Sequence, residues 1–173
     1  MKRNIFYVLS ICLSLSFVGT AYAQDQKPKA SPAETATGMV AGADIEIHYS
    51  SPAVKGRTIW GDLVPFDSVW RAGANEATTF QTSKDILVQG TSLPAGTYAF
   101  FLLPAESGQW TAIFNKQANQ WGAFEYDESQ DQLRVMVTPQ TLDATQERLK
   151  YNITASGFEL SWEKLKIPLA ITQ

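Results

Sequence analysis

The chain has a single cysteine and a single histidine, and these two shortages exclude several kinds of chemistry. Cys12 lies inside an N-terminal apolar run, so the chain beyond it has no disulfide and no thiol nucleophile. A catalytic zinc needs about three protein ligands, usually with more than one imidazole among them, and His48 alone does not supply these. We therefore expect no metal and no cofactor, and the core has to stabilise the fold without covalent cross-links.

Long apolar runs are also scarce, and the longest, residues 5–18, follows Lys2 and Arg3. The small-residue pattern Ala21-Tyr22-Ala23 closes this segment, so residues 1–23 are predicted to be an export signal. The run is shorter than the roughly 20 apolar residues of a membrane-spanning helix. We expect an exported protein without a membrane span, soluble after signal cleavage and either periplasmic or secreted.

Basic residues are too few for a partner that is a nucleic acid or an anionic lipid surface. The first 23 residues hold two of the 14 basic residues and no acid, so the rest of the chain has 12 basic against 17 acidic residues and a net charge of −5. Such an excess of negative charge disfavours a basic patch that would hold polyanions. The sequence does not specify an oligomeric state.

Apolar residues recur at every second position over most of the chain, as residues 45–49 show, and this is the spacing of a half-buried β-strand. Residues 97–103 are apolar on both faces, so we expect a central strand there. Only residues 116–120 and 143–148 have a helical composition, and each spans a turn or two. We count about nine short strands and predict an all-β fold, an antiparallel β-sandwich or a partly open barrel.

Residues 24–37 lack the alternating pattern and are rich in Pro, Ala, Lys and Thr. A segment of this composition buries too little apolar surface to order itself, so it is predicted to be a flexible tether. Residues 38–173 are then expected to form a single β-sandwich domain.

The stretch 56–76 breaks the alternation and concentrates residues that suit ligand binding. Tryptophan offers stacking faces, arginine a rigid fork of donors, and amide or carboxylate groups offer acceptors, a combination that fits planar, hydroxyl-rich or carboxylate ligands. The structural alternative pairs Arg71 with Glu76 and uses the tryptophans to fill the core. The candidate binding residues in this stretch are Arg57, Trp60, Asp62, Trp70, Arg71, Asn75 and Glu76.

A second polar cluster, residues 115–122, adds two candidates, Asn115 and Trp121. Trp121 precedes a glycine that leaves room for an exposed ring face, and the amides around it suit the hydroxyl groups of a ligand. The alternative is that asparagine and glycine only build turns here. The carboxylates that follow lack the spacing of a calcium loop, which favours a solvated acidic turn; they are Glu125, Asp127, Glu128 and Asp131.

Nucleophile and cofactor motifs are missing from the chain, which has no Gly-x-Ser-x-Gly elbow, no Walker loop and no dinucleotide-binding glycine pattern. We therefore assign no catalytic residue. His48 lies two residues from Glu46 on one strand face, but a lone histidine on a polar face is usually only solvated. One enzyme alternative stays open, a glycosidase-like hydrolase in which Glu76 acts with Asp62 or Asp127 if the loops bring two carboxylates together across a sugar.

Seven short strings distributed along the chain form a distinctive set. They are Tyr49-Ser50-Ser51-Pro52, Gly56-Arg57, Gly61-Asp62-Leu63-Val64-Pro65, Trp70-Arg71-x-Gly73-Ala74-Asn75-Glu76-Ala77-Thr78, Leu93-Pro94-Ala95-Gly96-Thr97-Tyr98, Trp121-Gly122 and Leu133-Arg134-Val135. Together they resemble one family of exported bacterial proteins, the DUF2911 family, over nearly all of the chain after the predicted tether. The resemblance implies an exported, β-rich domain, and it implies no reaction and no catalytic residue, because the family is a domain of unknown function.

The leading hypothesis from the sequence is an exported β-sandwich that binds a small polar or carbohydrate-like ligand, or a protein partner. The contacts would come from residues 60–76 with help from Trp121, because aromatic, basic and amide side chains gather there. The hydrolase and a purely structural accessory domain of the cell envelope are the alternatives.

We predict that the exported protein begins at Gln24, because Ala21 and Ala23 occupy the small-residue positions that signal processing reads. The intact mass of protein recovered after export is expected to equal that of residues 24–173. A mass that still includes the first 23 residues, or one increased by a lipid, would contradict this prediction.

Overall fold

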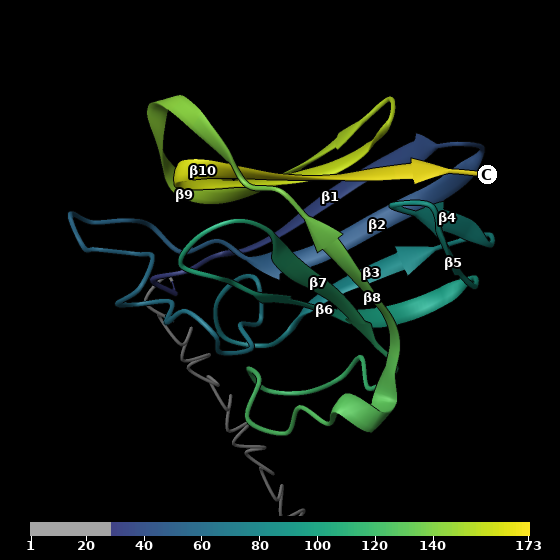
Figure 1. Ribbon diagram of the computed structural model, residues 1–173, viewed down its shortest axis with the longest axis horizontal. Helices are drawn as coiled ribbons and strands as arrows, with labels where there is room; N and C mark the ends of the chain where they lie inside the picture. The colour runs from purple at the N-terminus through teal and green to yellow at the C-terminus, as the bar shows by residue number, and fades with distance from the viewer. Residues whose placement is uncertain (1–28) are drawn as a thin grey trace, which may run out of the picture.

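The computed structural model describes residues 29–173, which form two antiparallel β-sheets packed face to face (Figure 1). The larger sheet has the strand order β1-β2-β3-β6-β7-β8, and the smaller sheet has the order β5-β4-β10-β9. Within residues 29–173 no helix is long and apolar enough to cross a membrane. The elements are β1 (Ala33–Val40), β2 (Ala43–Ser50), β3 (Thr78–Thr82), β4 (Ile86–Val88), β5 (Thr91–Leu93), β6 (Gly96–Leu103), β7 (Trp110–Asn115), the 3-10 helix η1 (Glu128–Gln130), β8 (Asp131–Val137), β9 (Gln140–Thr154) and β10 (Gly157–Thr172).

The predicted all-β fold is confirmed as a sandwich, and residues 29–173 form ten strands where the sequence indicated about nine. β1 also lies against β9, and β5 against β8, so the sheets approach each other along both edges without closing a barrel. Gly38 permits the first of these approaches, because a Cβ atom at this position would lie 2.8 Å from Cγ2 of Ile153. The predicted export signal and residues 24–28 of the predicted tether lie outside the described residues.

The core between the sheets is built from the inward-facing residues of the alternating strands. Its centre is a group of phenylalanine rings in edge contact, with Phe80 and Phe114 5.1 Å apart and Phe100 and Phe158 5.5 Å apart between ring centroids. These side chains are almost completely buried. Each such ring removes a large apolar surface from water, which is the main force holding the two sheets together.

Strand β6 is central, as the sequence predicted, because it pairs with β3 on one side and β7 on the other. Its residues bury both faces of the sheet. Tyr98, Phe100 and Leu102 belong to the main core, whereas Ala99 and Phe101 belong to a second apolar cluster on the outer face. The loop between β7 and β8 covers this second cluster, and in Figure 1 it lies on the side of the large sheet that faces away from β9 and β10.

The prediction of a flexible tether was wrong for residues 33–37, which form the first part of β1. These residues pair along β2, for example Thr37 opposite Glu46. Their side chains are mostly exposed, so backbone hydrogen bonds rather than apolar burial order them, and composition does not reveal that. The Tyr49 hydroxyl also donates to the Glu34 carboxylate at 3.0 Å, and burial raises the pKa of Tyr49 to about 12, so it remains a donor at physiological pH.

Neither of the two short helices suggested by composition is present. Residues 143–148 lie within β9, where Gln146 pairs with Glu163 of β10 and Arg148 pairs with Ala53. Residues 116–120 form part of an irregular loop. β9 is the last strand of its sheet, and its polar side chains face outward. It pairs with β10 on one side and with Ala53 on the other, and this pairing overrides the helix-forming composition.

The long connection between β2 and β3, residues 51–77, contains no strand and is held by hydrogen bonds to β9. The amide of Leu149 donates to the carbonyl of Pro52 at 2.9 Å, and the amide of Val54 donates to the carbonyl of Glu147 at 2.8 Å. β9 is the last strand of the small sheet, so these bonds cover its free edge.

The end of this connection is fixed by the carbonyl oxygen of Ala72, a residue that is completely buried. This oxygen accepts a hydrogen bond from the Tyr151 hydroxyl at 2.8 Å and another from the Thr78 hydroxyl at 3.1 Å. Ala72 has a φ of 52°, in the left-handed region, which costs a non-glycine residue about 1–2 kcal/mol. The two buried hydrogen bonds offset that cost and hold the turn that follows.

We predict that Tyr151→Phe and Thr78→Val each lower the free energy of unfolding by about 1 kcal/mol, because each leaves the Ala72 carbonyl with one donor. The double variant is expected to lose clearly more free energy of unfolding than the two single variants together, since the Ala72 carbonyl is then buried without a donor. Denaturant melts measure all three values.

Tyr98→Phe is the matched control, because its hydroxyl donates to the carbonyl of Pro94, an exposed residue that water reaches. Combined with Thr78→Val, it is expected to give a simply additive effect. Additive losses in the Tyr151 and Thr78 double variant would show that the two hydroxyls do not share one acceptor.

Candidate functional site

The strand-free connection between β2 and β3 forms most of a pocket of about 220 Å³, which we call the arginine pocket. Arg57, Trp70, Arg71 and Asn75 line it, so four of the nine candidates from the sequence lie together. Its other main walls are Leu63, Val64 and Trp162, the last of which comes from β10.

The two guanidinium groups of the pocket lack an acidic partner within residues 29–173. No carboxylate of these residues lies within 4.0 Å of Arg57 or Arg71. Arg71 is half-buried, and this desolvation lowers its pKa below the usual value for arginine, although the group stays charged at physiological pH. A half-buried cation without a counterion is costly, and it attracts an anion from solution.

Backbone oxygens and one aromatic ring orient the two side chains. Nη1 of Arg71 donates to the carbonyl of Asn75 at 2.9 Å, and its Cζ lies 5.7 Å from the centroid of the Phe124 ring. Arg57 donates from Nε to the carbonyl of Val54 at 3.1 Å and from Nη2 to that of Ala53 at 2.6 Å. These contacts use one donor of Arg71 and two of Arg57, so most N–H groups of both forks are left for a ligand.

A stack of tryptophans forms the apolar wall of the arginine pocket. Trp70 and Trp162 are stacked with ring centroids 5.8 Å apart and an interplanar angle of 18°. Trp60 packs edge-on against both rings from behind and contacts Trp110 as well. The structural alternative from the sequence therefore describes Trp60, which packs against the core and does not line the pocket, whereas Trp70 packs against the core and also lines the pocket.

The turn after Ala72 keeps Arg71 and Glu76 apart, so the structural alternative that paired them was wrong. Asn75 has a φ of 59°, and its side chain donates to the Ser50 hydroxyl at 3.1 Å. Glu76 emerges beyond this turn, where its carboxylate is largely exposed and lies 3.7 Å from the amine of Lys29.

Glu76 and Trp121 lie on a different surface from the arginine pocket. A single backbone bridge pairs these two residues, and both line a hollow on the outer face of the large sheet. Trp121 keeps 55% of its surface exposed. The sequence grouped them with the arginines, but the structure divides the candidates between two sites.

Asn115 and Asp62 lie in neither site. Asn115 is completely buried, and its amide nitrogen donates to the carbonyl of Asp127 at 2.9 Å and to the carboxylate of Asp131 at 2.8 Å. These bonds brace the loop between β7 and β8, so we leave Asn115 out of the site. Asp62 is exposed in a turn beside Gly61 and lines neither the arginine pocket nor the outer hollow.

The acidic residues after Trp121 hold the loop together through hydrogen bonds and ion pairs. Asp127 accepts from the amide of Ser129 at 2.9 Å and caps η1, and Asp131 pairs with Arg134 at 2.8 Å. The Tyr126 hydroxyl also donates to Asp131 at 2.6 Å. Within residues 29–173 no group of three or more His, Cys, Asp or Glu side chains is placed to hold a metal ion.

Sequence reasoning missed Leu63 and Trp162 as pocket residues. The residues around Leu63 are typical of a turn, and the residues around Trp162 predict an ordinary strand about 100 residues further along the chain. Neither residue has a local signal for the site, because only the packing of β10 against the connection brings them to the arginines.

Comparison with known proteins identifies one family. The family model described as "Protein of unknown function (DUF2911)" matches residues 31–171, nearly the whole chain. Searches of the curated proteins and of the solved structures found no significant match.

We predict that Arg71 and Glu76 contribute to stability independently. Glu76→Gln is expected to change the free energy of unfolding by less than about 0.5 kcal/mol, and Arg71→Gln by about 1 kcal/mol for the lost bond to the Asn75 carbonyl. The double variant is expected to equal the sum within about 0.5 kcal/mol in denaturant melts. A loss of roughly 3–5 kcal/mol in each single variant, partly recovered in the double, would indicate the buried pair instead.

Proposed function

The chain belongs to the DUF2911 family, whose function is unknown, and we propose from the arginine pocket that this protein binds a small organic carboxylate. The observation that carries the proposal is the pair of guanidinium groups, Arg57 and Arg71, that line one pocket without a carboxylate from residues 29–173 within 4.0 Å. Arginine forks match the two oxygens of a carboxylate in a bidentate arrangement.

The rest of the pocket suits the remainder of such a ligand. The stacked rings of Trp70 and Trp162, with Leu63, offer an apolar surface next to the two cations. A volume of about 220 Å³ is below the usual range for drug-sized ligands, so the occupant is a small molecule rather than a length of polymer. We therefore expect a compact acid with a flat or aliphatic body.

We also propose that this binding takes place outside the cytoplasm, because the sequence predicts an export signal over residues 1–23. The free carboxylate pair needed by the hydrolase alternative receives no support. Glu76 lines the outer hollow without Asp62 or Asp127, and Asp127 is engaged as the cap of η1. A binding protein rather than a carboxylate-based hydrolase is the function that the geometry favours.

The test is a thermal-shift screen of organic acids, each matched with its uncharged amide: benzoate with benzamide, cinnamate with cinnamamide, and hexanoate with hexanamide. A ligand that binds only the folded state raises the melting temperature, and saturation at 100 times Kd adds about 2.7 kcal/mol. At least one acid is expected to raise the melting temperature while its amide does not.

Variants of the two arginines assign the binding to the pocket. Arg71→Gln and Arg57→Gln are each expected to lower the affinity for the acid found in the screen by about tenfold to a hundredfold, because each removes a charged hydrogen-bond donor. Arg71→Lys keeps the charge and loses the fork, so it is expected to weaken binding less than Arg71→Gln. Lys84→Gln removes the same charge from an exposed turn away from the pocket and is expected to leave the affinity unchanged.

Two results would contradict the proposal. One is a screen in which no acid stabilises the protein more than its amide does. The other is an acid whose affinity is the same in the native protein and in Arg71→Gln. Either result would favour the structural role for the arginines.

A further inference from the structure

The outer face of the large sheet is divided into a bare half and a covered half. The loop between β7 and β8 covers β6 and β7, because Ala123 and Tyr126 pack on Phe101 and its neighbours there. Over β1, β2 and β3 most of the outward side chains are polar and face solvent, and Met39 of β1 is the large apolar exception. The edge of the covering loop forms a step between the two halves, and Trp121 lies at this step, where a backbone bridge pairs it with Glu76.

Two adjoining hollows run along this step and across the bare strands. One, of about 270 Å³, is lined by residues of β1, β2 and the start of β3, and the other, of about 340 Å³, is lined by Trp121 and Asn119. Glu76, Ala77 and Thr79 line both hollows, so the two adjoin. We call this surface the outer groove and define it by Thr35, His48, Glu76, Thr79, Asn119 and Trp121.

Trp121 is the most exposed tryptophan within residues 29–173. More than half of its surface is open, whereas Trp110 and Trp162 are buried and Trp60 and Trp70 are partly covered. The backbone just before Trp121 is held, because the Ala77 amide donates to the Gln120 carbonyl at 3.0 Å. A large, rigid aromatic face next to hydrogen-bonding groups stacks on the apolar face of a ring-shaped ligand.

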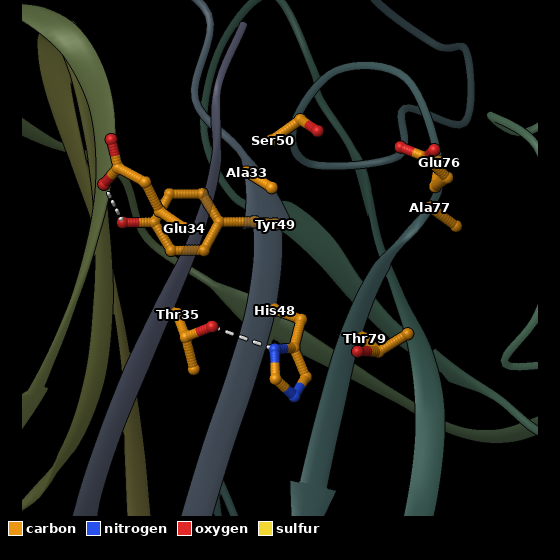
Figure 2. A pocket seen from close by; sticks show the side chains of 9 residues that line it. All are labelled: Ala33, Glu34, Thr35, His48, Tyr49, Ser50, Glu76, Ala77 and Thr79. Atoms are coloured by element: carbon orange, nitrogen blue, oxygen red, sulfur yellow. Dashed lines mark hydrogen bonds between the residues drawn. The ribbon is translucent and has the colours of Figure 1, made fainter. Parts of the chain in front are cut away.

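Hydrogen-bonding side chains extend from Trp121 along the groove. Figure 2 shows Thr35 and His48 side by side on β1 and β2, with Thr79 on the neighbouring strand. The Thr35 hydroxyl lies 2.9 Å from Nδ1 of His48, and Nε2 of His48 lies 3.0 Å from the Glu46 carboxylate. Thr35 and His48 are exposed and Thr79 is partly exposed, and the three are spaced by the distance between strands, so they present a row of donors and acceptors.

A buried acceptor in the wall of the groove also lacks a partner. Gln120 keeps only 8% of its surface exposed, and its Oε1 has no hydrogen-bond partner within residues 29–173. Its amide nitrogen is used, since it donates to the carbonyl of Gln117 at 2.8 Å. A buried acceptor of this kind is stabilised when a hydroxyl donor reaches it.

The charges of the outer groove select against anions. Glu76 lines both hollows and Glu34 lines the first, and the Glu46 carboxylate lies beside His48 at its edge. Lys29 lies 3.7 Å from Glu76. This is the opposite of the arginine pocket, so the two sites favour different ligands. The backbone of β2 and β3 is already paired on both sides, so a peptide cannot add to the sheet here as an extra strand.

We infer that the outer groove binds a neutral oligosaccharide, with one sugar ring stacked on Trp121 and the next rings bonded by the polar row on β1–β3. Sugar rings present an apolar face and a rim of hydroxyl groups, which match the aromatic face and the mixed donors and acceptors of the groove. This inference does not rest on the arginine pocket, because none of the six residues that define the groove lines that pocket.

The experiment is affinity electrophoresis in native gels that contain xylan, mixed-linkage β-glucan, mannan or amylose, with the anionic polygalacturonate for comparison. At least one neutral polysaccharide is expected to retard the protein, and polygalacturonate is not. Iodide quenching of tryptophan fluorescence gives a second readout, because Trp121 is the ring that iodide reaches most easily and a bound glycan shields it.

Variants then assign the binding to the groove. Trp121→Ala is expected to weaken glycan binding at least tenfold, and Trp121→Phe is expected to retain most of it. Met136→Ala is the control, expected to leave glycan binding unchanged, because Met136 is a large apolar residue that is 49% exposed and lines neither hollow nor the arginine pocket. His48→Ala provides a second site variant whose side chain lies on the sheet surface, and a partial loss is expected.

The outcomes separate this inference from the proposed function. Arg71→Gln is expected to leave glycan binding unchanged, and Trp121→Ala is expected to retain binding of the small acid. Absence of retardation by all four neutral polysaccharides would overturn the inference, as would equal retardation of Trp121→Ala and the native protein. Stronger retardation by polygalacturonate would overturn it too and would indicate a site for acidic polymers.

Discussion

The geometry of both candidate sites depends on the buried carbonyl oxygen of Ala72. Hydrogen bonds from Tyr151 and Thr78 hold it inside the sandwich and fix a turn with two residues in the left-handed region, Ala72 and Asn75. Because this turn is anchored to β9 and β3, the side chains on either side of it leave in fixed directions. Arg71 lines the arginine pocket, and Glu76 lies on the outer face of the sheet.

The loop between β7 and β8 connects the two surfaces that this turn creates. Phe124 lies against the guanidinium of Arg71, and Gly122 is so close that a Cβ atom there would come within 3.1 Å of the same group. A neighbouring residue of the loop, Trp121, is bridged to Glu76 and forms the step of the outer groove. The loop is itself held by Asn115, which is buried at the end of β7. The same loop therefore forms a wall of the outer groove and contacts the Arg71 guanidinium of the arginine pocket.

Particular elements show why the sequence predicted some features and missed others. The central place of β6 was readable because residues on both of its faces are apolar, and such a strand has to be covered on both sides. The first residues of β1 were missed, because exposed side chains on a strand that is ordered by backbone pairing leave no hydrophobic pattern. The composition of residues 143–148 was misleading for a related reason, since pairing with Glu163 and Ala53 overrides a helical preference.

The sequence by itself determined the all-β class, the alternation that builds the core, and the concentration of binding-type residues between Gly56 and Glu76. These features are local, because the direction of a side chain along a strand follows from its position in the chain. Only the tertiary structure decided that Arg57 and Arg71 share a pocket with Trp162, that Arg71 and Glu76 do not pair, and that Trp121 belongs to a second site. The physical reason is that irregular segments have no period. Hydrogen bonds from distant strands set their course, as the bonds of Tyr151 and Leu149 to the connection show.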